Sequence, residues 1–152
     1  MIVKSLDHLS LIAKKVADNL SYKDCVYLIG EIGVGKTTLA RSLINYLQKK
    51  EKIKTTEVLS PTFNLLHEYD IKKYKIMHYD LYRIKEKKEF ENLNIFSDEK
   101  KDIKIIEWPN LLKEKEESID KLEIYLDHSE NENEREIKFV GSGKWKNFKN
   151  EL

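Results

Sequence analysis

Over the first third of the 152-residue chain, two segments with helical spacing of apolar residues flank a continuous apolar run. Residues 6–20 place apolar side chains at three- and four-residue spacing, which predicts an amphipathic helix. Residues 25–29 form a short continuous apolar run that ends at Gly30, and this run predicts a buried strand. Helical spacing returns from Lys36 and lasts until the polar stretch 48–52. Strand, glycine-containing turn and helix in this order predict the opening of an α/β unit.

The rest of the chain favours strands over helices. Residues 63–69 and 75–79 alternate apolar and polar side chains around the polar segment 70–73, which predicts an antiparallel hairpin. No repeat, low-complexity stretch or linker interrupts the pattern. We therefore expect one domain over residues 1–152, of the α/β class, with a mixed sheet that includes the hairpin and is flanked by helices. The remaining elements are expected as a helix at 85–93 and as strands near Val58 and Leu59 and at 103–106, 122–126 and 137–140.

The composition narrows the classes of function. The chain carries 28 Lys and Arg against 27 Asp and Glu, a net charge of +1. A protein that grips duplex nucleic acid unaided shows a basic excess, so we expect no DNA binding. No run approaches the ~18 apolar residues of a membrane span, and residues 1–7 lack the layout of a secretory signal. The single cysteine, Cys25, excludes an internal disulfide. These features predict a cytoplasmic protein with no membrane partner.

The turn after the first buried strand carries a phosphate-binding motif. Residues 30–37 fit the pattern G-x-x-x-x-G-K-[ST] of a P-loop. Gly33 and Gly35 permit backbone angles that let successive N–H groups point at phosphate oxygens, and the following helix aims its positive end at the same place. Lys36 then supplies an ammonium for the β- and γ-phosphates, and the Thr37 hydroxyl ligates Mg²⁺. The motif predicts binding of a nucleoside triphosphate.

Two carboxylates follow predicted strands and are candidates to complete this site. Asp80 ends the hairpin and Glu107 ends the strand at 103–106. Mg²⁺ takes oxygen ligands from protein, phosphates and water, so either carboxylate is a candidate metal ligand or a group that orients the attacking water. The alternatives are a helix or turn cap for Asp80 and a sheet-edge residue for Glu107. Trp108 either stacks on a base or packs beside a proline, and His78 supports the hairpin rather than serving as an acid or base.

Four sequence elements follow one another along the chain: Gly30-Glu31-Ile32-Gly33-Val34-Gly35-Lys36-Thr37-Thr38, Ser60-Pro61-Thr62-Phe63, His78-Tyr79-Asp80-Leu81-Tyr82-Arg83 and Glu107-Trp108-Pro109. Together they resemble the TsaE (YjeE) family, the bacterial ATPases of tRNA threonylcarbamoyladenosine (t6A) biosynthesis. The resemblance covers about residues 25–109, in matching order and spacing. It implies a single P-loop α/β domain that binds Mg-ATP and associates with TsaD and TsaB in the modification of adenosine 37 of tRNA, so that tRNA is met indirectly through that complex.

The resemblance also implies roles for individual residues. Thr37 and Glu107 would ligate Mg²⁺, with Asp80 a further candidate for coordination or hydrolysis, and Trp108 lies near the nucleotide in the family pattern. Residues 60–63 are similar to the family's switch-like loop. The phosphates would be held by Gly30, Gly33, Val34, Gly35, Lys36, Thr37 and Thr38.

The chain departs from the family pattern in two places. Where the family often has a threonine near the adenine, this chain offers Leu9 followed by Ser10. Arg135 occupies the position of a possible nucleotide contact, in a diverged and charge-rich carboxy-terminal part. Contacts to the base are therefore the least defined part of the expected site.

Two other functions compete with that of a partner-coupled ATPase. A small-molecule kinase usually needs several arginines to grip phosphate bidentately, and this chain has three scattered ones, Arg41, Arg83 and Arg135. A nucleotide-dependent binding module would act by occupancy, with hydrolysis incidental. Because no arginine adjoins the P-loop in sequence, we expect an ATPase that is slow alone and responds to its partners.

Overall fold

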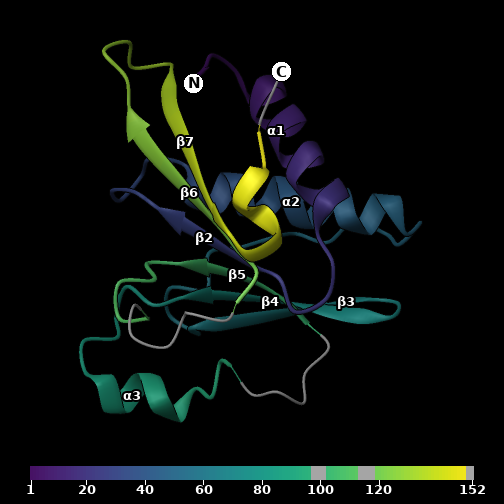
Figure 1. Cartoon of the computed structure of the whole chain (residues 1–152), viewed down its shortest axis with the longest axis vertical. Coiled ribbons are helices and arrows are strands. Elements are labelled where there is room, and N and C mark those ends of the chain that lie inside the picture. Colours follow the sequence, from purple (N-terminus) through teal and green to yellow (C-terminus); the bar gives the residue numbers. More distant parts are fainter. Residues whose placement is uncertain (97–101, 113–118, 150–152) are drawn as a thin grey trace.

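A computed structural model describes residues 1–96, 102–112 and 119–149 of the chain. Within these residues seven strands form one mixed sheet in the order β1-β7-β6-β2-β5-β4-β3 (Figure 1). The strands are β1 (Ile2–Val3), β2 (Cys25–Ile29), β3 (Leu66–Ile71), β4 (Tyr74–Asp80), β5 (Asp102–Glu107), β6 (Lys121–His128) and β7 (Arg135–Ser142).

The four central strands run in the same direction. β6, β2, β5 and β4 are parallel neighbours, whereas β3, β7 and β1 are antiparallel to the strands they pair with. The carboxyl ends of β2, β5 and β4 therefore meet at one edge of the sheet, on the left of Figure 1. In open α/β sheets this edge is where ligands bind.

Helices cover the sheet on both faces. α1 (Leu6–Asn19) and α2 (Lys36–Lys50) pack on one face, and their apolar stripes enter a core with Val26, Leu28 and Ile105. α3 (Lys87–Asn92) lies on the other face (Figure 1), where Phe90 packs with Tyr79 and Ile106. A 3₁₀ helix, η1 (Gly143–Asn147), follows β7 and buries Trp145 in the first core. No described helix is long and apolar enough to span a membrane.

The α/β class, the mixed sheet and the antiparallel hairpin are confirmed, with element bounds that differ from the prediction by a few residues. The prediction of a strand near Val58 and Leu59 is wrong, because residues 53–60 form no strand. Side chains of α2 bond this segment instead: Arg41 donates to the Val58 carbonyl, and the Gln48 amide pairs with Thr56. Residues 63–65 likewise turn before β3 begins, and Leu65 has a φ of 64°.

Strand β1 was not predicted; it has two residues and pairs with Arg135 and Glu136 of β7. A strand this short carries no detectable period, since alternation needs several residues to show. Its effect is large all the same, because it places the start of α1 beside the carboxyl half of the sheet. Ser5 then caps α1 by accepting a hydrogen bond from the His8 amide.

Candidate functional site

The P-loop joins β2 to α2 at the carboxyl edge of the sheet. Gly30 passes so close to β6 that a Cβ atom there would lie 2.3 Å from the Leu126 carbonyl oxygen, so a side chain would displace the loop. Gly35 caps α2 with a φ of 115°, a left-handed conformation that favours glycine. These two glycines fix where the loop leaves the sheet and where the helix begins. The loop borders a cavity of about 340 Å³.

Lys36 is folded back onto its own loop. Its ammonium donates hydrogen bonds of 2.7 Å to the carbonyl oxygens of Gly30 and Glu31 and lies 4.3 Å from the centroid of the Trp108 ring. Burial lowers the pKa of this ammonium, and the nearby carboxylates of Glu107 and Asp80 act in the opposite direction. The group thus rests against neutral oxygens and an aromatic face, within a site that also holds negative charge.

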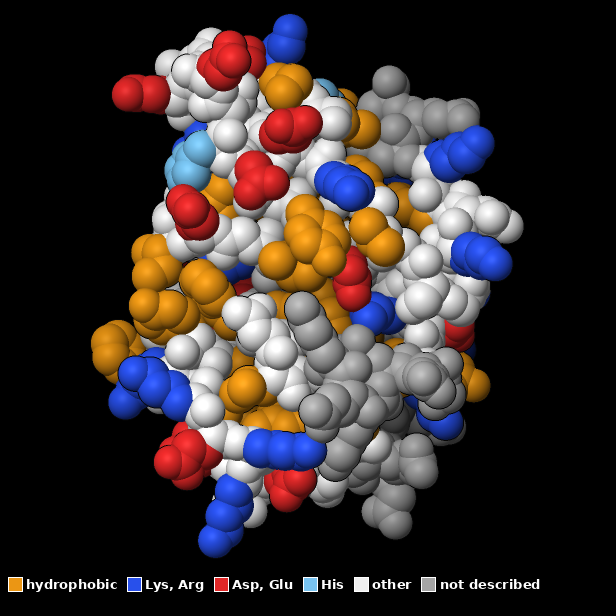
Figure 2. All heavy atoms as spheres, turned by 60° about the vertical axis from the view of Figure 1, so that its left-hand side comes forward, with side chains coloured by type: hydrophobic (Ala, Val, Ile, Leu, Met, Phe, Trp, Pro, Cys, Tyr) orange, Lys and Arg blue, Asp and Glu red, His pale blue; other side chains and the backbone are white. Residues whose placement is uncertain are grey.

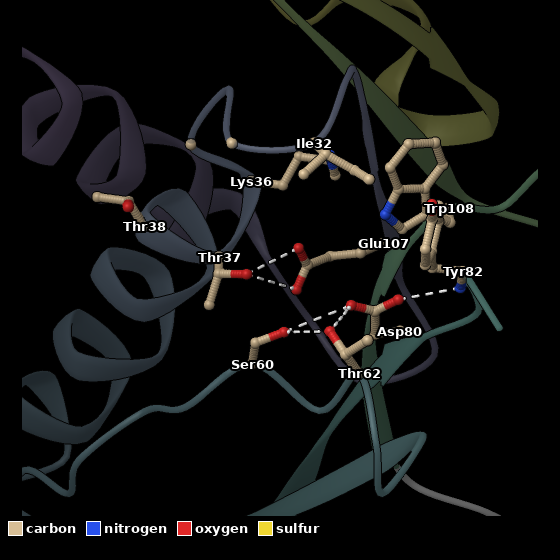
Figure 3. Close-up of a pocket in the computed structure, with 12 residues that line it drawn as sticks. Ile32, Lys36, Thr37, Thr38, Ser60, Thr62, Asp80, Tyr82, Glu107 and Trp108 are labelled. Carbon is tan, nitrogen blue, oxygen red and sulfur yellow. Dashed lines mark hydrogen bonds between the residues drawn. The ribbon is translucent and has the colours of Figure 1, made fainter.

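Thr37 and Glu107 meet at the floor of the cavity (Figure 3). The Thr37 hydroxyl donates to Glu107, at 2.9 Å from Oε1 and 3.2 Å from Oε2. Seventy residues separate the two in sequence, and they meet because Glu107 ends β5 beside β2, from which the loop leads into α2. On its other side Glu107 lies 2.7 Å from Nε2 of the buried His78. The structure therefore brings two predicted metal ligands together.

Asp80 caps the turn after β4 and also lines the cavity. Its Oδ1 accepts from the Tyr82 amide at 3.0 Å, which caps the turn after β4. Its Oδ2 accepts from the hydroxyls of Thr62 at 2.8 Å and Ser60 at 3.4 Å, and so ties the 60–63 loop to the site. Asp80 also lines the cavity beside Glu107, its register partner on β5. A capping residue and a member of the site are here the same side chain.

Aromatic and apolar side chains form the mouth of the cavity. Tyr82 and Trp108 pack ring against ring with centroids 4.8 Å apart. Ile32 from the loop lines the cavity and is 65% exposed. Phe63 follows the lining residue Thr62 and is 82% exposed, with the Arg83 guanidinium over its ring. Figure 2 shows hydrophobic side chains gathered in the middle of this face, with acidic side chains toward the β6–β7 end. Sequence patterns had singled out neither Ile32 nor Tyr82 for the site.

A second cavity, of about 310 Å³, opens on the other side of the P-loop. Arg135 lines it and is held by carbonyl oxygens, donating to Val34 at 3.0 Å and also to Glu132 and Glu134. Ser10 is exposed on α1 and does not line it. Val3, Leu6 and Leu9 do line it, and of these the family resemblance had pointed to Leu9 alone. The other lining residues are Ser5, Gly33, Val34, Gly35, Thr38, Leu126, Glu132 and Asn133.

The two cavities share Gly33, Gly35 and Thr38. The Thr38 side chain points away from the Thr37–Glu107 pair in Figure 3. Gly30 lines neither cavity and shapes the loop from behind. Parallel strands with a P-loop at the carboxyl edge define the class: this is a P-loop protein of the α/β type.

Comparison with known proteins identifies the family. Residues 3–137 match the model of "Threonylcarbamoyl adenosine biosynthesis protein TsaE", so the chain belongs to the TsaE family. A tRNA threonylcarbamoyladenosine biosynthesis protein TsaE of Rickettsia prowazekii is 40% identical over 101 residues, which are 66% of this chain and 67% of that protein. The TsaE of Aquifex aeolicus is 36% identical over 55% of this chain and 61% of its own length.

A solved structure shares the fold. The crystal structure of Bacillus subtilis YdiB matches with a TM-score of 0.67 over 95% of this chain and 85% of that one, at 24% sequence identity. The expected resemblance to the TsaE family is thereby confirmed, as is the fold class.

Proposed function

We propose that this chain is a Mg²⁺-dependent ATPase of t6A biosynthesis, that residues 1–152 act as one domain, and that it works with TsaB and TsaD and meets tRNA through their complex. Membership of the TsaE family supports the pathway. One observation carries the chemistry: the Thr37 hydroxyl lies 2.9 Å from the Glu107 carboxylate in a cavity bordered by the P-loop. A P-loop hydroxyl beside a strand-end carboxylate is the arrangement that P-loop NTPases use for their metal.

The donor set at this floor fits magnesium. Thr37 and Glu107 offer only oxygen, which Mg²⁺ prefers, and Mg²⁺ is usually held by one or two protein groups together with phosphates and water. Among the described residues no group of three or more His, Cys, Asp or Glu side chains is placed to hold a metal alone. Thr37 and Glu107 would hold the ion, with Asp80 beside them. Once bound, Mg²⁺ neutralises the charge on the transferred phosphoryl group.

In this proposal the first cavity holds the phosphates of the nucleotide and the second cavity holds its base. Ideal Cβ atoms on Gly33 and Gly35 would meet no other atom within 4 Å, so the backbone on that side is open to phosphate oxygens. The first cavity, with Lys36 and Thr37, suits the phosphates. The second cavity shares Gly33, Gly35 and Thr38 of its lining with the first and has apolar walls from α1, which suits the base. Arg135 supports this second cavity by holding the Val34 carbonyl.

The arginines favour slow turnover without partners. Arg41 donates to the Val58 carbonyl, Arg135 is held by three carbonyls, and Arg83 lies over Phe63 at the mouth. An arginine delivered to the transition state raises the rate of phosphoryl transfer by about 10³–10⁵. Because all three of this chain's arginines are engaged elsewhere, rapid hydrolysis needs Arg83 to move or a partner to act. The same shortage argues against a small-molecule kinase.

The test is co-purification with TsaB and TsaD followed by measurement of ATP turnover. We expect slow hydrolysis by the pure chain and a change in rate when both partners are added. Phosphate transfer to nucleosides or nucleoside monophosphates would favour the kinase instead. Binding of ATP that changes complex affinity without any turnover would favour a module acting by occupancy. Absence of ATP binding under all these conditions would contradict the proposed function.

A further inference from the structure

His78 is buried beneath the site and touches it at one point. The side chain is 0% exposed, on the strand that ends at Asp80. Its Nε2 lies 2.7 Å from Glu107 Oε2. A carboxylate oxygen accepts, so Nε2 carries the hydrogen and donates it. Among the described residues Nδ1 has no hydrogen-bond partner, which makes the bond to Glu107 the one polar anchor of the ring there.

The register of the sheet explains this placement. β4 and β5 are parallel, with His78 opposite Ile105 and Asp80 opposite Glu107. Because side chains alternate between faces with a period of two, these four residues all point toward the face that α2 covers. Asp80 and Glu107 line the cavity, whereas His78 lies one step deeper in the sheet and does not line it. His78 therefore reaches the site through Glu107.

Glu107 is held from two sides. Thr37 donates to it from α2, nearer to Oε1, and His78 donates to Oε2 from the adjacent strand. A carboxylate held at one point can rotate about its last bond, and a second donor fixes which oxygen faces the neighbouring hydroxyl. Groups that orient metal ligands in this way commonly change metal affinity or activity by about 10–100-fold when they are removed.

We propose that His78 is the positioning residue of this site: by donating from Nε2 to Oε2 it holds Glu107 so that Oε1 faces Thr37 and the metal. This inference rests on the proposed function, in which Thr37 and Glu107 hold Mg²⁺. A histidine that only supports the hairpin would affect stability when replaced and leave the response to Mg²⁺ unchanged. The two roles therefore differ in a measurable way.

Two polar variants of His78 distinguish the positioning role from a purely structural one. In His78→Gln the amide nitrogen occupies about the place of Nε2 and still reaches Glu107, whereas in His78→Asn it occupies about the place of Nδ1 and falls short. His67→Asn is the matched control, since His67 is the register partner of His78 on β3 and does not line the cavity. The readout is binding of a fluorescent ADP analogue, measured in chelator and over a Mg²⁺ titration.

We expect His78→Asn to raise the Mg²⁺ concentration for half-maximal enhancement of binding by about 10–100-fold, with binding in chelator unchanged. His78→Gln and His67→Asn should stay near the wild-type midpoint. Equal midpoints for all the proteins, or equal impairment of the Gln and Asn variants, would overturn the role of His78. A wild-type protein that does not bind the analogue, or binds it without any effect of Mg²⁺, would instead overturn the proposed function.

Should the His78 variants fail to fold, ¹⁵N NMR of the wild-type protein decides. The ring of His78 should show hydrogen on Nε2, and its signals should move when Mg²⁺ joins the bound analogue. In Glu107→Ala the same addition should leave them in place. A ring with its hydrogen on Nδ1 alone, or signals that ignore Mg²⁺ in the wild type, would overturn the role of His78.

Discussion

The Lys36 ammonium lies 4.3 Å from the centroid of the Trp108 ring while donating to two carbonyls of its own loop. A phosphate entering the cavity offers this ammonium a negatively charged acceptor, which neutral carbonyls and an aromatic face do not match. Lys36 must turn away from Trp108 to take it. The environment of Trp108 is therefore coupled to occupancy of the phosphate site.

Tryptophan fluorescence should report this movement. We expect nucleotide binding to change the emission of Trp108, because the indole loses its cation and gains a neighbour. The chain's other tryptophan, Trp145, is buried in the core beside Phe148 and serves as the control. The response should persist in Trp145→Phe and vanish in Trp108→Phe. A response that follows Trp145 would contradict the coupling of Trp108 to the site.

Lys36→Ala should weaken nucleotide binding and leave the fold intact. A charge-assisted hydrogen bond contributes about 1.5–3 kcal/mol, so affinity should fall roughly ten- to a hundredfold. Because burial lowers the pKa of Lys36, its removal should cost the free protein little stability. Isothermal titration with ATP and thermal melting check the two parts. Undiminished ATP binding would remove Lys36 from the phosphate site.

Replacement of Asp80 should cost both stability and turnover. Asp80→Ala removes hydrogen bonds from the exposed Ser60 and Tyr82 and the half-buried Thr62. Because these donors reach water, we expect a loss of about 1–3 kcal/mol in total. Thr62→Val removes one of these bonds and keeps the carboxylate, so it is the matched control. We expect Asp80→Ala to lose more ATP turnover than Thr62→Val. Equal losses of turnover would mean that Asp80 acts only by holding the 60–63 loop.

Much of the fold followed from local signals in the sequence. The continuous apolar run Cys25–Ile29 and the helical spacing from Lys36 are strong local signals, and both elements lie where they were expected. Residues 53–60 do not form the strand expected there, because side chains of α2 form hydrogen bonds with this segment in place of a neighbouring strand. An apolar pair such as Val58 and Leu59 cannot reveal which partner its backbone will find, since that depends on tertiary packing.

The candidate site likewise has one part that local sequence predicts and another that depends on tertiary structure. The P-loop and the two strand-end carboxylates are local patterns, so Thr37 and Glu107 could be singled out from the sequence. The link from His78 to Glu107 depends on the register of two parallel strands, which strand patterns alone do not determine. The second cavity depends on β1, which is too short to detect. Sequence motifs thus predict which residues form the candidate site, whereas strand pairing determines which residues support them.

Asp24, a buried carboxylate paired with the exposed Lys144, makes stability depend on pH. Burial raises the pKa of Asp24 above its ordinary 3.8, and hydrogen bonds from Lys144 and the Ser21 backbone only partly offset this. In the window just above pH 3.8 the folded protein binds more protons than the unfolded chain. The Asp24 contribution to the free energy of unfolding therefore falls as pH rises through that window.

Urea unfolding of Asp24→Asn against wild type measures this contribution, because asparagine does not titrate. The stability of the variant relative to wild type should rise between pH 3.5 and about pH 7. Asp18→Asn is a control of opposite sign, since its hydrogen bond from Lys50 lowers the pKa of Asp18. The relative stability of that variant should fall over the same range. A flat or falling difference for Asp24→Asn would contradict the assigned shift.

Glu107→Gln separates metal-dependent chemistry from nucleotide binding. The substitution keeps the size of the side chain and removes the negative charge offered to Mg²⁺, while the loop backbone and Lys36 still hold the phosphates. We therefore expect ATP affinity in chelator to stay near that of the wild type. Hydrolysis should fall by about 10–100-fold or more, since the metal is no longer held.

The most direct test of a catalytic metal site is ATP turnover at saturating Mg-ATP, with TsaB and TsaD present, for the wild type and Glu107→Gln side by side. We predict that the wild type hydrolyses ATP and that Glu107→Gln does not, although the variant still binds ATP. Wild-type turnover in Glu107→Gln would contradict a catalytic metal site at Thr37 and Glu107.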